Sequence, residues 1–175
     1  MIFQTYNPRM RVAASIFWIA WFLAPAANAR EKWLPSQHAP SLLSAVVSSR
    51  LRARIERVMF HGEVYDSEEQ QYIVRMSSVE PVSLGPGEER ALLVRGGGGF
   101  CGATGNCAIW VFDPVDGAVL LNQGLGYRVV LSSAVHQGHY DIVITSNLSC
   151  CSGLHDTYRF DGKTYVKFKT VPYGH

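Results

Sequence analysis

Two cysteine-bearing stretches could carry chemistry. GGGGFCGATGNC (residues 96–107) and SNLSCCSGLH (146–155) hold all four cysteines of the 175-residue chain. A phosphate-binding loop needs a lysine after its glycines and then a helix, whereas here no lysine follows and the next residues alternate like a strand. Structural zinc sites favour two to four residues between paired cysteines, but five separate Cys101 from Cys107. The first stretch is therefore predicted to be a strand connection closed by a disulfide.

The pairing of the cysteines stays open at this level. A local Cys101–Cys107 disulfide is the simplest of three connectivities, and it leaves Cys150 and Cys151 as a vicinal pair. The rival pattern ties the two stretches together, Cys101 or Cys107 to Cys150 or Cys151. Metal binding by the four cysteines with His155 is a weaker alternative, because adjacent cysteines suit tetrahedral ligation poorly.

A second group of reactive residues comprises His136, His139 and Asp141 in HQGHYD, with His155 and Asp156 further on. Imidazoles and a carboxylate can together bind catalytic zinc and leave one position open. The spacing matches no recognised ligand motif, and the first two histidines fall in a predicted turn, where polar residues are expected. We therefore predict no catalytic residue, no metal ligand and no cofactor, and keep a cell-envelope hydrolase as an alternative.

The first 29 residues have the pattern of a secretory signal peptide. Arg9 and Arg11 precede the uncharged stretch VAASIFWIAWFLAPA, and Ala-Asn-Ala at 27–29 fits a signal peptidase site. The apolar stretch is shorter than the roughly 20 residues that span a bilayer. We expect cleavage after Ala29, a periplasmic or secreted protein, and no membrane contact after cleavage.

The charge balance argues against nucleic acid as a partner. The whole chain has 16 Lys and Arg against 14 Asp and Glu, a formal net charge of +2. Two of the basic residues would leave with the signal peptide, so the mature chain would be neutral. Nucleic-acid binders generally carry a clear basic surplus.

One amphipathic helix and a linker are predicted within residues 30–69. Apolar residues recur at helical spacing between 41 and 59, and Gly62 follows the last of them. We expect this helix to cover an edge or an open end of a β domain.

Residues 70–175 are predicted to form a duplicated β domain, with unit one at 70–124 and unit two at 125–175. The apolar period falls to two, and four stretches of unit one correspond to four of unit two. The pairs are 72–79 with 127–135, 91–95 with 141–145, 108–113 with 156–161, and 118–123 with 164–169. Self-similarity at about 50 residues indicates a repeated supersecondary unit, here a four-stranded antiparallel meander with hairpin turns at DPVDG and DG.

The fold class is therefore mainly β: two duplicated meanders, arranged as a sandwich, a barrel or blades, after one N-terminal helix. Within the third strand of each unit, Trp110 and Phe112, like Tyr158 and Phe160, share one face. We expect this aromatic face to be core. Val111 and Arg159 occupy the other face.

The pair YDIVIT and YRFDGKTYV resembles the repeats of secreted proteins with VCBS or FG-GAP blades. CGATGNCAIWVF combined with TYRFDGKTYVKF also resembles an uncharacterised family of small exported bacterial proteins, over residues 90–169. The chain lacks the Asp-x-Asp-x-Asp-Gly calcium loop of FG-GAP repeats, so the resemblance implies neither a calcium site nor a closed propeller.

The function expected from these features is a non-enzymatic binding module for a protein or glycan of the cell envelope. Long loops at one end of a rigid sheet commonly carry recognition. The expected contact residues, all taken to be exposed, are Phe100, Thr104, Asn106 and His155. An inhibitor of a cell-wall hydrolase is one concrete version. A structural module that assembles with itself is the alternative.

Overall fold

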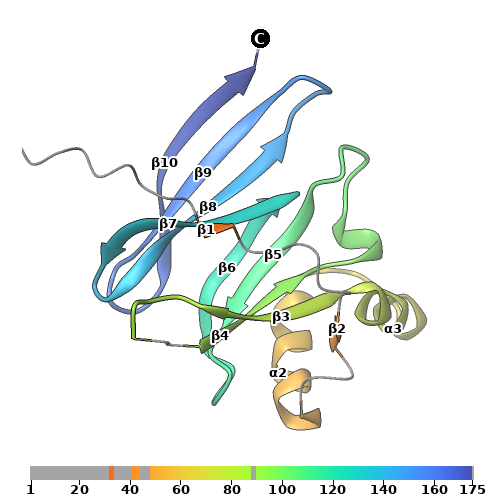
Figure 1. Ribbon diagram of the computed structural model, residues 1–175. Helices are drawn as coiled ribbons and strands as arrows, with labels where there is room; N and C mark the ends of the chain where they lie inside the picture. The colour runs from red at the N-terminus through yellow and green to blue at the C-terminus, as the bar shows by residue number, and fades with distance from the viewer. Residues whose placement is uncertain (1–31, 34–40, 44–47, 88–89, 175) are drawn as a thin grey trace, which may run out of the picture.

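The computed structural model describes residues 32–33, 41–43, 48–87 and 90–174, and shows two antiparallel five-stranded sheets (Figure 1). The mainly β class is thus confirmed. The first sheet has the order β2 (Ser41–Leu42), β3 (Ser78–Ser83), β4 (Arg90–Arg95), β5 (Cys107–Phe112) and β6 (Val119–Gly126). The second has the order β1 (Lys32–Trp33), β7 (Arg128–His136), β8 (His139–Asn147), β9 (Ser152–Phe160) and β10 (Tyr165–Gly174). The predicted signal peptide lies outside the described residues.

Each sheet contains one of the predicted four-stranded meanders, β3 to β6 and β7 to β10. The hairpins close as their sequences suggest. Gly117 and Gly162 have the positive φ angles, 73° and 103°, that favour glycine in turns. Asp161 accepts hydrogen bonds from the backbone of Lys163 and Thr164, each at 2.8 Å, and so fixes the β9–β10 turn.

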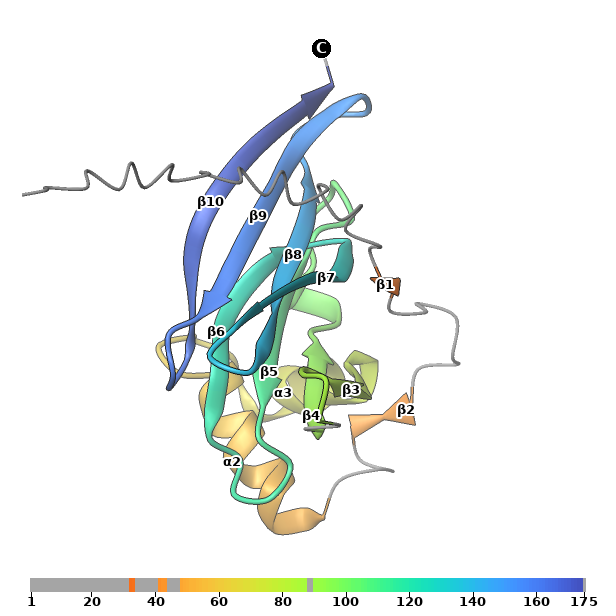
Figure 2. The ribbon, with the colours of Figure 1, turned by 60° about the vertical axis from the view of Figure 1, so that its left-hand side comes forward.

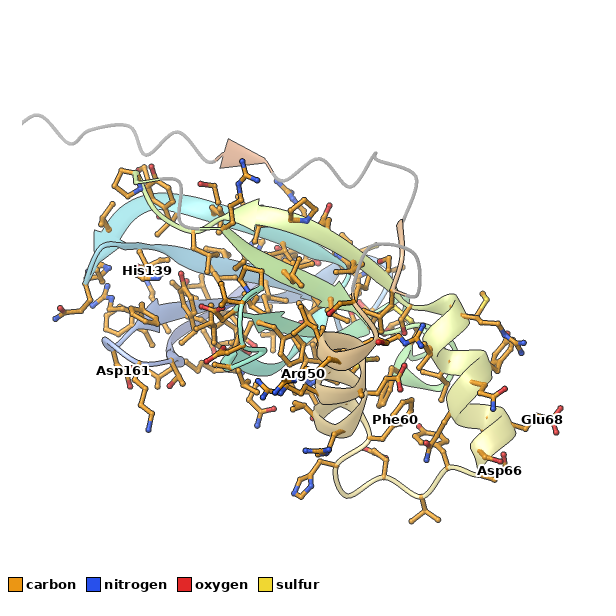
Figure 3. All side chains as sticks on the ribbon, turned by 90° about the horizontal axis from the view of Figure 1, so that it is seen from below. Arg50, Phe60, Asp66, Glu68, His139 and Asp161 are labelled. Atoms are coloured by element: carbon orange, nitrogen blue, oxygen red, sulfur yellow. A yellow bond between two sulfur atoms is a disulfide. The ribbon has the colours of Figure 1, made fainter. Side chains whose placement is uncertain are left out.

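The helical part of the prediction needs two corrections. Ser41 and Leu42 form strand β2, and helix α2 spans only Ser49–Met59, with Ser48 as its N-cap. The predicted strand at 72–79 is wrong, because helix α3 spans Ser67–Met76 and β3 begins at Ser78. The N-cap Asp66 lies at the start of α3 (Figure 3). It forms a capping box with Glu69, and such a box satisfies backbone N–H groups that lack partners in the first turn.

The helices cover a face of the first sheet rather than an edge or open end. Trp110, Phe112 and Val94 pack against Ile55 and Met59 of α2, together with Ile73 of α3. Figures 1 and 2 show both helices gathered at the end of the molecule opposite the C-terminal end of β10. This helix–sheet core explains why the strand β5 is apolar on both faces.

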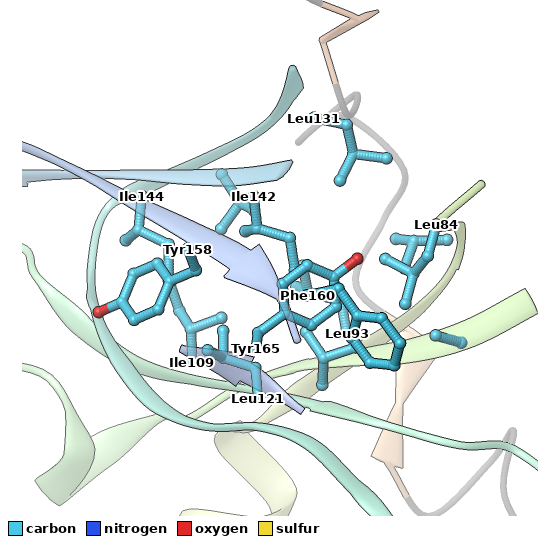
Figure 4. Packing of buried hydrophobic residues seen from close by; sticks show 14 residues of the cluster. Leu84, Leu93, Ile109, Leu121, Leu131, Ile142, Ile144, Tyr158, Phe160 and Tyr165 are labelled. Atoms are coloured by element: carbon cyan, nitrogen blue, oxygen red, sulfur yellow. The ribbon is translucent and has the colours of Figure 1, made fainter. Parts of the chain in front are cut away.

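The opposite face of the first sheet packs on the second sheet. Leu93, Ile109 and Leu121 meet residues of the second sheet in a common core (Figure 4). The second-sheet residues labelled there are Leu131, Ile142, Ile144, Tyr158, Phe160 and Tyr165. The fold is therefore three layers: helices, first sheet, second sheet.

The aromatic faces of the two meanders are both core, as predicted, but they belong to different cores. Trp110 and Phe112 face the helices, whereas Tyr158 and Phe160 face the other sheet. Each meander thus turns its aromatic face the same way, and the second meander packs that face on the back of the first.

Candidate functional site: the joined loops

The glycine run at 96–99 serves packing rather than phosphate binding. Gly97 N donates to Ser77 Oγ at 3.1 Å, and Ser77 Oγ donates to Ile73 O at 2.8 Å, just after α3 ends. A Cβ atom on Gly97 would lie 2.2 Å from Met76 O, so only glycine permits this approach. Within the run, only Gly98 has a positive φ, 53°.

Phe100 was expected to be exposed and is not. Its side chain is only 7% exposed and lies in the helix–sheet core. Its ring centroid is 5.1 Å from that of Trp110 and 5.5 Å from that of Phe60. Phe100 is the last residue of the short 3-10 helix Gly98–Phe100, which turns its side chain inward. It anchors the loop and cannot contact a partner.

A disulfide joins Cys101 and Cys107, with an S–S distance of 2.08 Å. The local pairing is thus confirmed, and the rival disulfides between the two stretches are wrong because both of these sulfurs are used. Inside the loop, Gly102 N donates to Asn106 O at 2.8 Å and Gly105 N donates to Gly102 O at 3.0 Å. The disulfide and these bonds hold a tight turn.

Cys150 and Cys151 do not form the vicinal disulfide that would complete this connectivity. They are exposed free thiols whose Sγ atoms lie 2.9 Å apart. The hydrogen bond to Cys150 raises the pKa of the Cys151 thiol. A raised thiol pKa lowers the thiolate fraction at neutral pH. Leu148 N and Ser149 N both donate to Ser152 O, at 2.9 and 3.1 Å, and close the turn that presents the two thiols.

Asn106 joins the two cysteine-bearing loops. Its Nδ2 donates to Asn147 O at 2.7 Å, and its Oδ1 accepts from Asn147 N at 2.8 Å. Asn147 Nδ2 returns a third bond to Thr104 O at 3.3 Å. Asn106 is 7% exposed, so its amide is shielded from water and makes these hydrogen bonds to Asn147 in place of bonds to solvent. We call residues 101–107 and 146–152 the joined loops; Figure 1 shows them at the end of the sheets away from the helices.

Two aromatic residues extend the joined loops along the outer face of the second sheet. Tyr173 donates through its hydroxyl to Asn147 Oδ1 at 2.9 Å, and its ring stacks on His155 with centroids 4.6 Å apart. His155 Nδ1 lies 3.0 Å from Thr145 Oγ1. A hydrogen bond with Tyr127 raises the pKa of Tyr173, which keeps the phenol protonated. A connected polar surface therefore runs from Thr104 to His155.

Three of the four predicted contact residues thus belong to one surface, although Asn106 is buried within it. Asn147 and Tyr173, which connect them, were missed by sequence reasoning. Asn147 lies three residues before Cys150 in the same predicted loop, so it could have been included among the candidate contact residues. Tyr173 carries no signal, because only the register of β10 on β9, with Tyr173 opposite Gly153, brings it to the loops.

The His/Asp cluster is only partly assembled. His136 Nδ1 lies 2.8 Å from Asp141 Oδ1, and Arg159 approaches Asp141 Oδ2 at 3.6 Å. His139 instead stacks on Phe160, with centroids 3.9 Å apart, and Asp156 bonds Lys167 at 2.7 Å. Within the described ranges, no group of three or more His, Cys, Asp or Glu side chains could hold a metal ion. Asp141 is 3% exposed, and its two partners satisfy a carboxylate in a sheet.

Comparisons with protein families, with curated proteins and with solved structures found no match to this chain. None of the helices in the described part of the chain is long and apolar enough to cross a membrane.

Proposed function

We propose that the protein is an exported, non-enzymatic binding module that recognises a protein or glycan of the cell envelope through the joined loops. The observation that carries the proposal is the set of three hydrogen bonds between Thr104, Asn106 and Asn147. They connect loops of two different sheets, so the loop tips keep one mutual arrangement before any partner binds. A preorganised surface loses little conformational entropy on binding.

The surface also offers suitable contact groups. Thr104 is exposed, and Leu148, at 63% exposure, stands out of the neighbouring turn. An apolar side chain beside hydroxyl and amide groups is the mixture found in protein and glycan interfaces. Export is supported by the signal-peptide pattern of residues 1–29 and by the Cys101–Cys107 disulfide, since disulfides persist in oxidising compartments.

A cell-wall lysis assay tests the concrete version, an inhibitor of a hydrolase such as a lysozyme. Purified residues 30–175 are added to cell-wall suspensions with and without lysozymes of several types, and turbidity is followed. Thr104→Arg and Leu148→Asp change the joined loops. Val115→Asp is the matched control, because Val115 is 90% exposed in the β5–β6 turn at the other end of the sheets.

The expected result is slower lysis with the wild type and with Val115→Asp, and normal lysis with the two loop variants. Equal inhibition by all four proteins would remove the joined loops as the contact site. Normal lysis with the wild type would eliminate the inhibitor. Clearing in the absence of any lysozyme would instead favour the hydrolase, with His136 and Asp141 as the first residues to change.

A further inference from the structure

A groove of about 700 Å³ opens between the two sheets, far from the joined loops. β6 is the last strand of the first sheet and β10 is the last strand of the second. Residues of both strands line the groove. Arg57 and Val58 in the last turn of α2, with His61 just after the helix, close one side. Small-molecule sites generally occupy roughly 300–1,000 Å³, so the groove is large enough for one.

The floor of the groove is apolar. Leu121, Tyr158 and Tyr165 are 1%, 7% and 5% exposed, and all three belong to the core between the sheets. These three side chains are already almost fully covered. The apolar surface that a ligand could remove from water comes from Val58 and Val119, which are half-buried and also line the groove.

The rim of the groove is basic. Arg57, His61 and Lys167 line it, and no Asp or Glu is among its lining residues. Lys167 is held in place because its Nζ lies 2.7 Å from Asp156 Oδ2 and 5.6 Å from the ring centroid of Tyr158. Asp156 neutralises Lys167 in part, whereas Arg57 makes no ion pair within the described residues. The guanidinium of Arg57 is thus the charge best placed to attract an anion.

We propose that this groove binds an anionic amphiphile of low molecular mass, an apolar chain or ring that carries one carboxylate or phosphate. The apolar part lies on the floor formed by Leu121 and the two tyrosines and covers the half-buried Val58 and Val119. The anionic group meets Arg57 at the rim. The site is separate from the joined loops, so either can fail without the other.

Calorimetry with three ten-carbon probes below their micelle concentrations tests the proposal: decanoate, decyl phosphate and decyltrimethylammonium. The protein is residues 30–175, which hold every described element and omit the apolar predicted signal. At least one anionic probe is expected to bind at least about tenfold more tightly than the cation of equal chain length. The stronger anionic probe identifies a carboxylate or a phosphate ligand.

Three variants locate the site. Arg57→Glu is expected to weaken the better anionic probe by about tenfold or more, since a like charge replaces the attracting one. Arg75→Glu is the matched control; this exposed helix residue lies outside the groove, and binding should be unchanged. Thr164→Trp, whose indole would fill the groove, should abolish binding.

Equal affinity for the anionic and cationic probes, or undiminished binding to Arg57→Glu or Thr164→Trp, would overturn the proposal. Binding of an acidic extended peptide in place of all three probes would also overturn it, and would assign the groove to strand pairing with β6 or β10.

Discussion

The two meanders share a strand pattern but differ in how many of their faces are covered. The first is buried between the helices and the second sheet, while the second packs only its aromatic face. We call the face opposite the aromatic face of each sheet its back. Residues at matching positions on the two backs differ in polarity and exposure. Leu93 and Val111 of the first sheet are 2% and 0% exposed, whereas the matching positions of the second hold Val143 and Arg159.

This difference explains why the stack ends after two sheets. The back of the first sheet is apolar and accepts the aromatic face of the second. The back of the second sheet carries Asp141 with its partners His136 and Arg159, and Arg159 also lies over the Phe168 ring at 3.6 Å. Another aromatic face packed there would remove the remaining water from His136 and Arg159, whose side chains are about one third exposed (33% and 32%). The polar outer face therefore disfavours the addition of a third sheet by the same packing.

Exchanging the residues at the matched position should give the largest effect. Val111→Arg places an unpaired charge in the core between the sheets and is expected to lower the free energy of unfolding by about 5 kcal/mol. Arg159→Val, on the outer face, should cost about 1 kcal/mol, because Asp141 keeps His136 as a partner. Urea unfolding followed by circular dichroism measures both changes.

Similar losses for the two variants would show that the outer face of the second sheet is as buried as the inner one. Arg159→Val has a second readout. If polarity of the back ends the stack, this variant should self-associate more than the wild type in analytical ultracentrifugation.

Truncation of the aromatic residue in the helix–sheet core comes next. Trp110→Ala removes a side chain that is 1% exposed and supports Phe100, and we expect a loss of about 4 kcal/mol in the free energy of unfolding. Thr157→Ala, on the back of the second sheet, should change it by less than about 0.5 kcal/mol. Thermal unfolding compares the two, and a small effect of Trp110→Ala would contradict the burial of the first sheet on both faces.

The same contrast shows what the sequence could predict. The apolar stretches of the sequence located β4 to β10, including β7 at the predicted 127–135. In β9, which buries one face, apolar and polar residues alternate, whereas β4 and β5 are covered on both faces and are almost continuously apolar. The strand prediction failed at 72–79, where the resemblance between YIVRMSSV and YRVVLSSAV concealed a helix. The capping signal Asp66-Ser67-Glu68-Glu69 precedes this stretch and indicates the start of a helix.

The candidate site was less predictable than the fold. The loops could be located because they interrupt the alternation, but the contact between them depends on how the sheets stack. Asn106 was predicted as an exposed contact residue, yet the stacking places Asn147 against it and buries its amide. The groove had no local signal at all, since its lining comes from α2, β6, β9, β10 and the β9–β10 turn.

Breaking the hydrogen bonds between Asn106 and Asn147, which join the two loops, should lower the free energy of unfolding by an intermediate amount. Asn106→Leu leaves Asn147 N and O without their partners, and we expect a loss of about 2 kcal/mol in the free energy of unfolding. The amide of Asn147 should also exchange with deuterium faster, which NMR can follow. Thr104→Ala removes only the hydroxyl that accepts from Asn106 Nδ2 at 2.8 Å, so its effect should be smaller. Unchanged exchange at Asn147 in Asn106→Leu would show that the loops are held by other contacts.

The smallest expected change in the free energy of unfolding concerns the β9–β10 turn. This turn belongs to the second sheet and lies away from the joined loops. Backbone hydrogen bonds from Thr164 and Lys163 hold the pKa of the Asp161 carboxyl below its ordinary value of 3.8. The carboxylate therefore stabilises the fold fully above that value, and this contribution is lost as the pH falls through the lower folded pKa. Asp161→Asn should be slightly less stable than the wild type at pH 7, and the difference should shrink in acid. Asp116→Asn, in the corresponding turn of the first meander, is the control, because Asp116 also bonds one backbone N–H, that of Ala118. A stability difference for Asp161→Asn that stays constant from pH 7 to below the folded pKa would mean that the side chain acts through its shape and not through its charge.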